Sequence, residues 1–406
     1  MLSLEIFGRS HEKFIGVNAH GFPAGEKIDI SLLGEFMSRR APKHRHEPDI
    51  PVIESGITEG YTDGKTIRII IENVDVKSSD YDNLKYIPRP GHADYPVFVK
   101  YEGREDMRGG GKFSGRMTAP LCAAGGVAKQ ILSHHGIEIN AYVKEIYGCS
   151  EASKFEDIML TAKEEGDSVG GIVECHISGM PIGIGDAGQN SLESIISSYV
   201  FSVPACKGIE FGLGFESARV KGSENNDEYA IKDNSVVFLS NNSGGILGGI
   251  STGQDIIFRA AFKPTPSIAR KQKSVNLKTM ENTDLEIKGR HDVCIAPRAA
   301  VAVEACAALA VLSLSDFEND SKNKLRNNID EIDREIAKLL SDRFEITDKI
   351  GTFKKNQNIR DEKREAQVIK NVSSVCDEKY IDEISSIYEE IIRKSCKRQE
   401  DALING

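Results

Sequence analysis

Apolar and polar residues in the first three quarters of the chain follow patterns that predict both strands and helices. Three short runs, Thr66–Val74, Ile172–Ile177 and Ile256–Phe262, are rich in β-branched and aromatic residues and predict strands. Met117–His134 and Ala299–Leu314 are rich in alanine and apolar almost all round, so we expect two helices buried in the core. Because the strands do not alternate regularly with the helices, a doubly wound parallel sheet is not indicated.

The last part of the chain has a different pattern, in which apolar residues recur at steps of three and four. This spacing predicts a long helix with an apolar seam, which consists of Leu325, Ile329, Ile332, Ile336, Leu339, Ile346, Ile350 and Phe353. The next seam position after Leu339 holds Arg343, and Lys354 follows about three turns later on nearly the same face. A charged side chain on a seam needs a partner or an anion. The helix is therefore either a coiled-coil stalk with a polar specificity position or part of an anion-binding site.

Two further helices are predicted after this seam. Arg360 to Glu365 opens a shorter helix, and a last helix spans about Tyr380–Leu403. The apolar side of the last helix continues into Ser395 and Gln399, which are polar where apolar residues would be expected. A cavity lined by such residues, with no histidine, suits a dianion whose reaction needs no proton transfer.

Composition changes near residue 316 and divides the chain into two unlike parts. Residues 317–406 hold 18 Lys and Arg and 20 Asp and Glu, so about 42% of them are charged against 28% of the whole chain. They contain no proline, no histidine and two of the 37 glycines, which favours a nearly all-helical tail. The polar stretch 316–323 is the predicted linker between a loop-rich α+β body at 1–315 and the tail at 324–406.

Charge and cysteine usage exclude several classes of protein. With 52 basic and 62 acidic residues the formal charge is −10, which argues against a general nucleic-acid binder. We find no long apolar run without charges, so no membrane span is predicted. The first residues do not form a basic region followed by an apolar stretch, so no secretory signal is predicted. The eight cysteines form no C-x-x-C pair, so zinc sites and disulfide frameworks are not expected, and a reducing cytoplasm is the simplest location.

Five clusters in the body combine glycine, arginine and histidine. They are Gly8–His11, Arg89–Asp94, Arg108–Arg116, Asn241–Gly249, and Lys263–Ser267 together with Gly289–Asp292. Consecutive glycines expose backbone N–H groups, arginines bind phosphate and carboxylate, and histidines exchange protons near neutral pH. Each glycine-rich run taken alone is more often a turn than an anion site. Together the clusters predict an anionic substrate without naming a reaction.

Two standard nucleotide motifs do not apply. Gly183–Gly188 fits G-x-G-x-x-G, but Pro181 separates it from the preceding strand and no acidic residue ends a second strand at the required distance. Lys112 is followed by Phe113 instead of Ser or Thr, so the glycines before it do not form a Walker A loop.

In their order along the chain, the five clusters resemble those of chorismate synthase over roughly residues 1–315. The resemblance implies a β-α-β sandwich, usually assembled as a homotetramer, and conversion of 5-enolpyruvylshikimate 3-phosphate into chorismate by anti-1,4-elimination of phosphate. It also implies a requirement for reduced FMN in a redox-neutral reaction. The sequence leaves open whether the chain reduces its flavin with NADPH or relies on an external flavin reductase. A plain flavin reductase would need a nicotinamide site that we do not find.

The resemblance also implies roles for individual residues. His92 would help protonate the departing phosphate, His11 would lie by the flavin, and Asp292 would steer a proton to the flavin N5 with Ser10 as relay. The positions that match FMN contacts are Arg40, Arg45, Lys112, Phe113, Ser114, Pro204, Ala205, Gly248, Lys263, Pro264, Thr265, Pro266, Ser267 and Arg290. Those that match basic positions around the substrate are Arg39, Arg108, Arg116 and Arg298.

The chain departs from the family's pattern at two of these motifs. The first motif is usually GESHG, and here Arg9 and Glu12 make it GRSHE. The flavin loop usually carries RSS or RFS, and here it carries Lys112-Phe113-Ser114. Neither change removes a proposed proton carrier, but the first reverses a charge next to one of them.

The tail resembles the all-helical class of chorismate mutase over about residues 322–404, which implies a three-helix domain. Arg343, Lys354 and Arg364 would hold the carboxylates and the ether oxygen. Gln399 would donate to that oxygen, and the residues that fix the ring hydroxyl or shape the pocket would be Asp361, Glu365 and Ser395. Arg326 also matches, but it lies roughly 25 Å along the helix from Arg343. The family solves this with an interlaced dimer that lends each site the partner's arginine.

The two resemblances together imply a bifunctional shikimate-pathway enzyme. The body would make chorismate and the tail would convert it to prephenate by a Claisen rearrangement. The alternative is a chorismate synthase with a non-catalytic helical tail for oligomerisation or effector binding. Polar side chains that interrupt the seam at substrate-sized intervals favour the mutase over a stalk.

Overall fold

A computed structural model describes residues 2–40, 49–74, 86–287, 292–315, 317–353 and 360–404. Within these ranges, the side chains of residues 108, 317–328 and 402–404 are outside the description. The chain forms two compact units, Met1–Ser315 and Asp316–Gly406.

The first unit contains two antiparallel four-stranded sheets. One has the strand order β1 (Ser3–Gly8), β2 (Phe14–His20), β6 (Ile67–Glu72) and β3 (Pro51–Ser55). The other has the order β7 (Glu138–Ile146), β8 (Gly171–Ser178), β14 (Ile256–Phe262) and β9 (Cys206–Phe211). Strand residues alternate between buried and more exposed positions, as in β14, because only one face of each sheet meets the core. The three strands predicted from sequence, now β6, β8 and β14, are confirmed.

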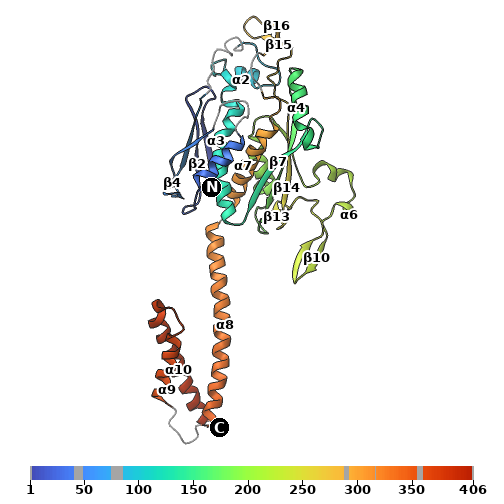
Figure 1. The fold of residues 1–406 in the computed structure, drawn as a ribbon. Helices are drawn as coiled ribbons and strands as arrows, with labels where there is room; N and C mark the ends of the chain where they lie inside the picture. The colour runs from blue at the N-terminus through green and yellow to red at the C-terminus, as the bar shows by residue number, and fades with distance from the viewer. Residues whose placement is uncertain are drawn as a thin grey trace. The chain divides into compact units, whose positions relative to one another are not determined.

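A layer of helices lies between the sheets, as Figure 1 shows. It is built from α1 (Ile30–Arg40), α3 (Thr118–His134), α5 (Leu192–Phe201) and α7 (Ala296–Leu314). The α3 helix packs on the first sheet through β2 and β6, and α7 packs on the second through β7 and β8. The two central helices approach closely, because a Cβ at Gly125 of α3 would overlap Ala305 of α7. The predicted β-α-β sandwich and its two buried helices are therefore confirmed.

In the described part of the chain, α7 is the one helix long and apolar enough to cross a membrane. It is a core helix, because most of it is buried against α3, α5 and the strands β7 and β8 of the second sheet. All eight cysteines lie in the described residues, and none of them forms a disulfide.

Short elements connect these layers. They are β4 (Ile57–Thr58), β5 (Tyr61–Thr62), α2 (Asp94–Lys100), η2 (Arg108–Phe113), η3 (Gly115–Met117), η4 (Ala152–Lys154), α4 (Phe155–Glu164), η5 (Gly188–Asn190), η6 (Gly214–Arg219), α6 (Gly222–Asn225), β10 (Tyr229–Lys232), β11 (Ser235–Phe238), β12 (Ile246–Leu247), β13 (Ile250–Ser251), β15 (Gln272–Asn276) and β16 (Glu281–Leu285). The discounted motif at 183–188 follows an antiparallel strand and bridges to β13 through Gly185, which is unlike a dinucleotide-binding turn.

The second unit is helical, as predicted. It consists of α8 (Phe317–Phe353), α9 (Glu362–Ser373), η7 (Glu378–Tyr380) and α10 (Ile381–Ile404). Residues 317–323, expected as a linker, form the first turns of α8. No proline follows them, and Gly351 is the first glycine, so nothing in the sequence ends the helix earlier.

The α10 helix covers only one end of α8. Arg398 of α10 donates from Nε to Asp348 Oδ1 of α8 at 3.0 Å, and Gly351 packs against Gln399. The seam residues are exposed along the described length of α8, from 45% for Ile350 to 87% for Phe353, and the stretch toward its start consists of Ile329, Ile332, Ile336 and Leu339. A contiguous apolar stripe of this kind marks a surface that another molecule covers.

Candidate active sites

The glycine loop of the body brings two predicted proton carriers together. In η2 the residues Gly109, Gly110 and Gly111 all have positive φ (58°, 91° and 53°), a conformation that side chains other than glycine rarely adopt. A Cβ at Gly109 would overlap His11 Nε2, and one at Gly110 would lie 3.4 Å from His92 Nε2. The two histidines thus contact consecutive glycines, although 80 residues of sequence separate them.

His92 is held by its own cluster. Its Nδ1 lies 2.6 Å from Asp94 Oδ1, and the guanidinium of Arg89 donates to the same carboxylate from Nε at 2.7 Å. Burial raises the pKa of Asp94, but hydrogen bonds from Arg89 and His92 outweigh it and hold the pKa well below its ordinary value. An ionised carboxylate can only accept, so His92 Nδ1 is the donor in its contact with Asp94. Nε2 faces Gly110 and also lies 3.3 Å from Arg89 Nη2, which can only donate. Sequence reasoning missed Asp94 as a site residue, although the H-x-D spacing could have suggested it.

The segment Lys263–Ser267 joins the same cluster. Lys263 Nζ donates to Gly91 O, and Arg89 Nη1 donates to Ser267 Oγ at 3.3 Å. Lys263 N donates to Ala205 O at 3.0 Å, which also connects the predicted pair Pro204 and Ala205 to this site. Burial lowers the pKa of Lys263, and nearby Lys207 lowers it further.

Asp292 is connected to the same segment. Its backbone oxygen accepts from Thr265 Oγ1 at 2.7 Å, and its carboxylate pairs with Arg298 Nη1 at 2.6 Å. Thr265 is a predicted cofactor contact, and Arg298 is a predicted substrate contact. The proposed relay from Ser10 to Asp292 stays a prediction.

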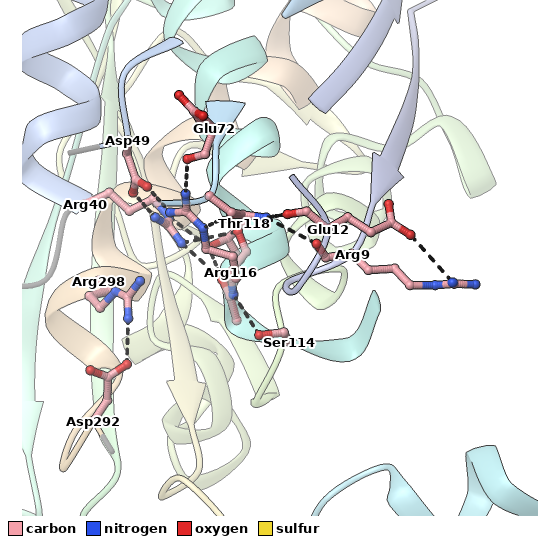
Figure 2. A network of polar contacts seen from close by, with 12 residues as sticks. Arg9, Glu12, Arg40, Asp49, Glu72, Ser114, Arg116, Thr118, Asp292 and Arg298 are labelled. Atoms are coloured by element: carbon pink, nitrogen blue, oxygen red, sulfur yellow. Dashed lines mark hydrogen bonds and ion pairs between the residues drawn. The ribbon is translucent and has the colours of Figure 1, made fainter. Parts of the chain in front are cut away.

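A buried ion network lies next to Ser114 and Arg116, which follow the glycine loop in the chain (Figure 2). Asp49 is 1% exposed and accepts hydrogen bonds from Arg40, which is 0% exposed, and Arg116, which is 9% exposed. Arg40 also donates to Thr118 Oγ1 at 3.0 Å and to Gly115 O at 3.2 Å. The sequence predicts Arg40 at the cofactor and Arg116 at the substrate. In the structure both arginines contact Asp49 and so tie it to the end of the loop, and their predicted ligand contacts stay predictions.

Asn73 extends this network to the turn that carries His11. Its Oδ1 accepts from Arg116 Nε at 2.9 Å, while its Nδ2 donates to Glu12 O at 2.7 Å and Arg9 O at 3.3 Å. Sequence reasoning missed both Asp49 and Asn73, because no local pattern shows that their partners are far away in the chain.

Replacing Asp49 with asparagine should destabilise the body by roughly 3–5 kcal/mol, because two buried guanidinium groups would lose their carboxylate. Urea unfolding of the full chain, followed through the transition of the body, measures this. Asp284 is a matched control, since it pairs with two lysines, Lys271 and Lys273, but is far more exposed. Asp284→Asn should change stability much less than Asp49→Asn, because water screens an exposed ion pair. Equal effects of the two substitutions would contradict the importance of the buried network.

The remaining predicted residues of the body fall into four groups. Arg39 donates to both oxygens of the buried Glu304, at 3.0 and 2.8 Å, so its contacts are within the core. Lys112 lies at the end of η2 beside Phe113, exposed, and donates to Tyr101 OH at 3.0 Å. Gly248 sits in the β12–β13 turn, and no described contact joins that turn to the glycine loop. Arg45 and Arg290 lie outside the described residues, as do the side chain of Arg108 and, in the tail, Lys354 and the side chain of Arg326.

The second unit brings its predicted polar residues together between α8 and α10. Arg343 Nη1 donates to Ser395 Oγ at 2.5 Å, and Ser395 and Gln399 are both buried. Among the described residues Gln399 Oε1 has no hydrogen-bond partner, although the side chain is only 8% exposed. Because Oε1 is an acceptor, it is suited to a ligand group that donates, while Nε2 of the same amide is the atom that can donate to a ligand oxygen.

The start of α9 carries the other predicted residues of the tail. Asp361 caps the helix by accepting from Arg364 N at 3.1 Å, and the Arg364 side chain is exposed. Glu365 is half-buried, with Oε1 3.8 Å from Cys396 Sγ of α10. The carboxylate of Glu365 therefore faces the helix that carries Ser395 and Gln399.

Comparison with known proteins gives two matches that divide the chain near its composition boundary. The sequence model of chorismate synthase matches residues 2–315, and that of chorismate mutase type II matches residues 325–400. The chorismate synthase of Chitinophaga pinensis is 44% identical over 332 residues, covering 80% of this chain and 98% of that protein. The Pyrococcus abyssi chorismate synthase is 44% identical over 337 residues, covering 77% and 95%. A crystal structure of a chorismate synthase has a TM-score of 0.61 at 26% identity, covering 77% of this chain and 91% of that one.

Proposed function

We propose that this chain catalyses two consecutive reactions. It belongs to the chorismate synthase family and carries a chorismate mutase type II domain. The body eliminates phosphate from 5-enolpyruvylshikimate 3-phosphate to give chorismate, and the tail rearranges chorismate to prephenate. The observation that carries the first assignment is the contact of His11 and His92 with consecutive glycines of one loop. The second rests on Arg343, Ser395 and the unsatisfied Gln399 between two helices.

In the body, we assign proton transfer to His92. Its Nδ1 hydrogen is fixed by Asp94, so Nε2 is the atom that would give a proton to the departing phosphate. Ionised Asp94 would stabilise the positive charge that the ring carries before this transfer. His11, Ser10 and Asp292 keep the proton-handling roles that the family resemblance implies.

The residues around the glycine loop fit a reduced flavin. Three cationic side chains, those of Lys112, Lys263 and Arg298, and the hydroxyls of Thr265 and Ser267 belong to segments that contact one another there. Such a donor set suits the phosphate of FMN and the anionic substrate. These residues would hold the reduced flavin, which would supply electron density to the allylic system when the phosphate departs. We infer that FMN is the flavin, and that NADPH or an external reductase supplies its reduction.

In the tail, catalysis needs no proton transfer, because a Claisen rearrangement moves electrons within one molecule. Arg343 would bind a carboxylate of chorismate, and the Gln399 amide would donate to the ether oxygen as negative charge develops there. Lys354 and Arg364 would complete the cationic lining, while Asp361, Glu365 and Ser395 would shape the pocket. Holding the reactive conformer and stabilising this charge are the two means of rate enhancement.

The exposed stripe on α8 supports a dimer of tails. Ile329, Ile332, Ile336 and Leu339 would be covered by the same helix of a second copy. Such an interlaced arrangement would bring Arg326 of one copy to the Arg343 site of the other copy. Within one chain, Arg326 and Arg343 are too far apart along the helix to share a small ligand. We further propose a homotetramer of the bodies and a cytoplasmic location, the latter supported by eight cysteines without a disulfide.

The test of the proposed function is a single anaerobic assay of the full chain. With catalytic reduced FMN and 5-enolpyruvylshikimate 3-phosphate, we expect prephenate to form with no net consumption of reductant. Omitting the flavin should stop this reaction, whereas added chorismate should still be converted because the tail needs no flavin. Full-rate elimination without flavin, or one equivalent of reductant used per product, would contradict the assignment of the body.

A further inference from the structure

The turn that carries His11 is fastened from two sides. On its inner side, Asn73 Nδ2 donates to the backbone oxygens of Arg9 and Glu12. On its outer side the Arg9 side chain reaches across to Glu105, with Nη2 3.3 Å from Oε1. Arg9 also approaches Glu12, at 3.6 Å, within the turn itself. The contact with Glu105 is therefore the one through which the Arg9 side chain connects the turn to another segment of the chain.

Glu105 lies between the two segments that meet at His11. Its side chain is only 11% exposed, against 43% for Arg9 and 51% for Glu12. A second cation, Lys112 Nζ of the glycine loop, lies 3.6 Å from its other oxygen. A carboxylate with so little access to water needs such cations to remain charged. The coupling free energy between Arg9 and Glu105 should consequently be larger than that between Arg9 and the exposed Glu12.

We propose that Arg9 and Glu105 are a positioning pair that holds the His11 turn against the glycine loop. The pair spans the place where His11 contacts Gly109, four residues after Glu105. Arg9 stands where the related motif has glutamate, so in this chain Glu105 balances the reversed charge. A glutamate at position 9 would instead face Glu105 as a like charge, which destabilises the contact.

This pair predicts that restoring the family's motif by Arg9→Glu damages the enzyme. The proposal rests on the synthase activity proposed above. We expect Arg9→Glu and Glu105→Arg each to lower kcat/KM for chorismate formation by about 10-fold or more, since each places like charges together. The double variant, with the charges exchanged, should recover part of this loss, and the recovery is incomplete because an arginine at position 105 still faces Lys112. Arg9→Lys should retain most of the activity.

A matched control uses the other acidic neighbour of Arg9. Combining Arg9→Glu with Glu12→Arg exchanges the charges of the exposed pair instead, and it should not restore activity. Glu12→Arg alone should leave the rate nearly unchanged. A positioning role also predicts that the loss appears mainly in kcat and that mutase activity on added chorismate is unchanged in the same sample.

The outcomes separate this proposal from the proposed function. If the natural chain forms no chorismate with reduced FMN, the proposed function fails. If it does, and the losses in the Arg9–Glu105 cycle simply add, or the Glu12 exchange restores activity equally well, the pair is not a positioning device. Should Glu105→Arg fail to fold, a cycle of Arg9→Gln and Glu105→Gln measures the same coupling, and additive losses would again overturn the proposal.

Discussion

Arg343→Leu is expected to abolish prephenate formation from added chorismate while leaving chorismate formation by the body intact. Arg343 occupies a seam position between α8 and α10, where it donates to Ser395 beside the unsatisfied Gln399. Loss of one partner of a buried, charge-assisted contact to a substrate carboxylate costs several kcal/mol, so the mutase rate should fall more than about 10²-fold. Initial rates with chorismate, and separately with the phosphorylated precursor, measure the two effects.

The same substitution distinguishes a mutase from a stalk. In a coiled-coil stalk, leucine at this seam position would replace a partly desolvated charge by packing and raise the stability of the tail. In a mutase the change removes a ligand contact instead. Full mutase activity in Arg343→Leu would return the tail to the stalk interpretation, whatever happens to its stability.

Mixing two inactive variants tests the dimer of tails. Arg326→Ala should also lose mutase activity, although Arg326 lies about 25 Å along the helix from Arg343. A mixed dimer of Arg326→Ala and Arg343→Leu chains has one site that retains both arginines, so partial activity should return after subunit exchange. Absence of rescue, once exchange has been verified by differently tagged chains, would contradict the interlaced arrangement.

The sequence predicted the parts of the fold in which local pattern and burial coincide. The helices α3 and α7 are apolar on all sides because they lie between two sheets, and this is visible in their composition. The polar interruptions at Ser395 and Gln399 likewise proved to be buried. Each of these features is a property of one segment, so no knowledge of distant partners was needed.

The arginines show where sequence reasoning reaches its limit. A guanidinium binds a carboxylate of the protein as readily as one of a ligand, and the residue type does not say which. Arg40 and Arg116 are directed to Asp49, and Arg39 is directed to Glu304, across 265 positions of the chain. Only the folded structure reveals that these carboxylates are buried and must be paired.

His92→Ala should lower chorismate formation by about 10²-fold or more, because a positioned proton donor is lost. His11→Ala should have an effect of the same order. The mutase activity of both variants should survive, since the tail is a separate compact unit with its own contacts. Unchanged synthase rates in both variants would remove these histidines from the mechanism.

Asp94→Asn tests whether the orientation of the His92 ring matters while the ring itself is retained. The low pKa of Asp94 keeps it ionised throughout the assay range, so it accepts only and fixes the hydrogen on His92 Nδ1. An asparagine can also donate, so the ring loses both this preference and the stabilisation of its charged form. We expect a loss of about 10-fold in kcat, smaller than that of His92→Ala, together with a lower stability of the body because the buried Arg89 also loses this carboxylate. His134→Ala is the matched control, because His134 also faces a carboxylate, Glu26 at 3.4 Å, and no described contact joins it to the glycine loop. A synthase rate in Asp94→Asn equal to that of His134→Ala would show that the carboxylate next to His92 does not take part in proton transfer.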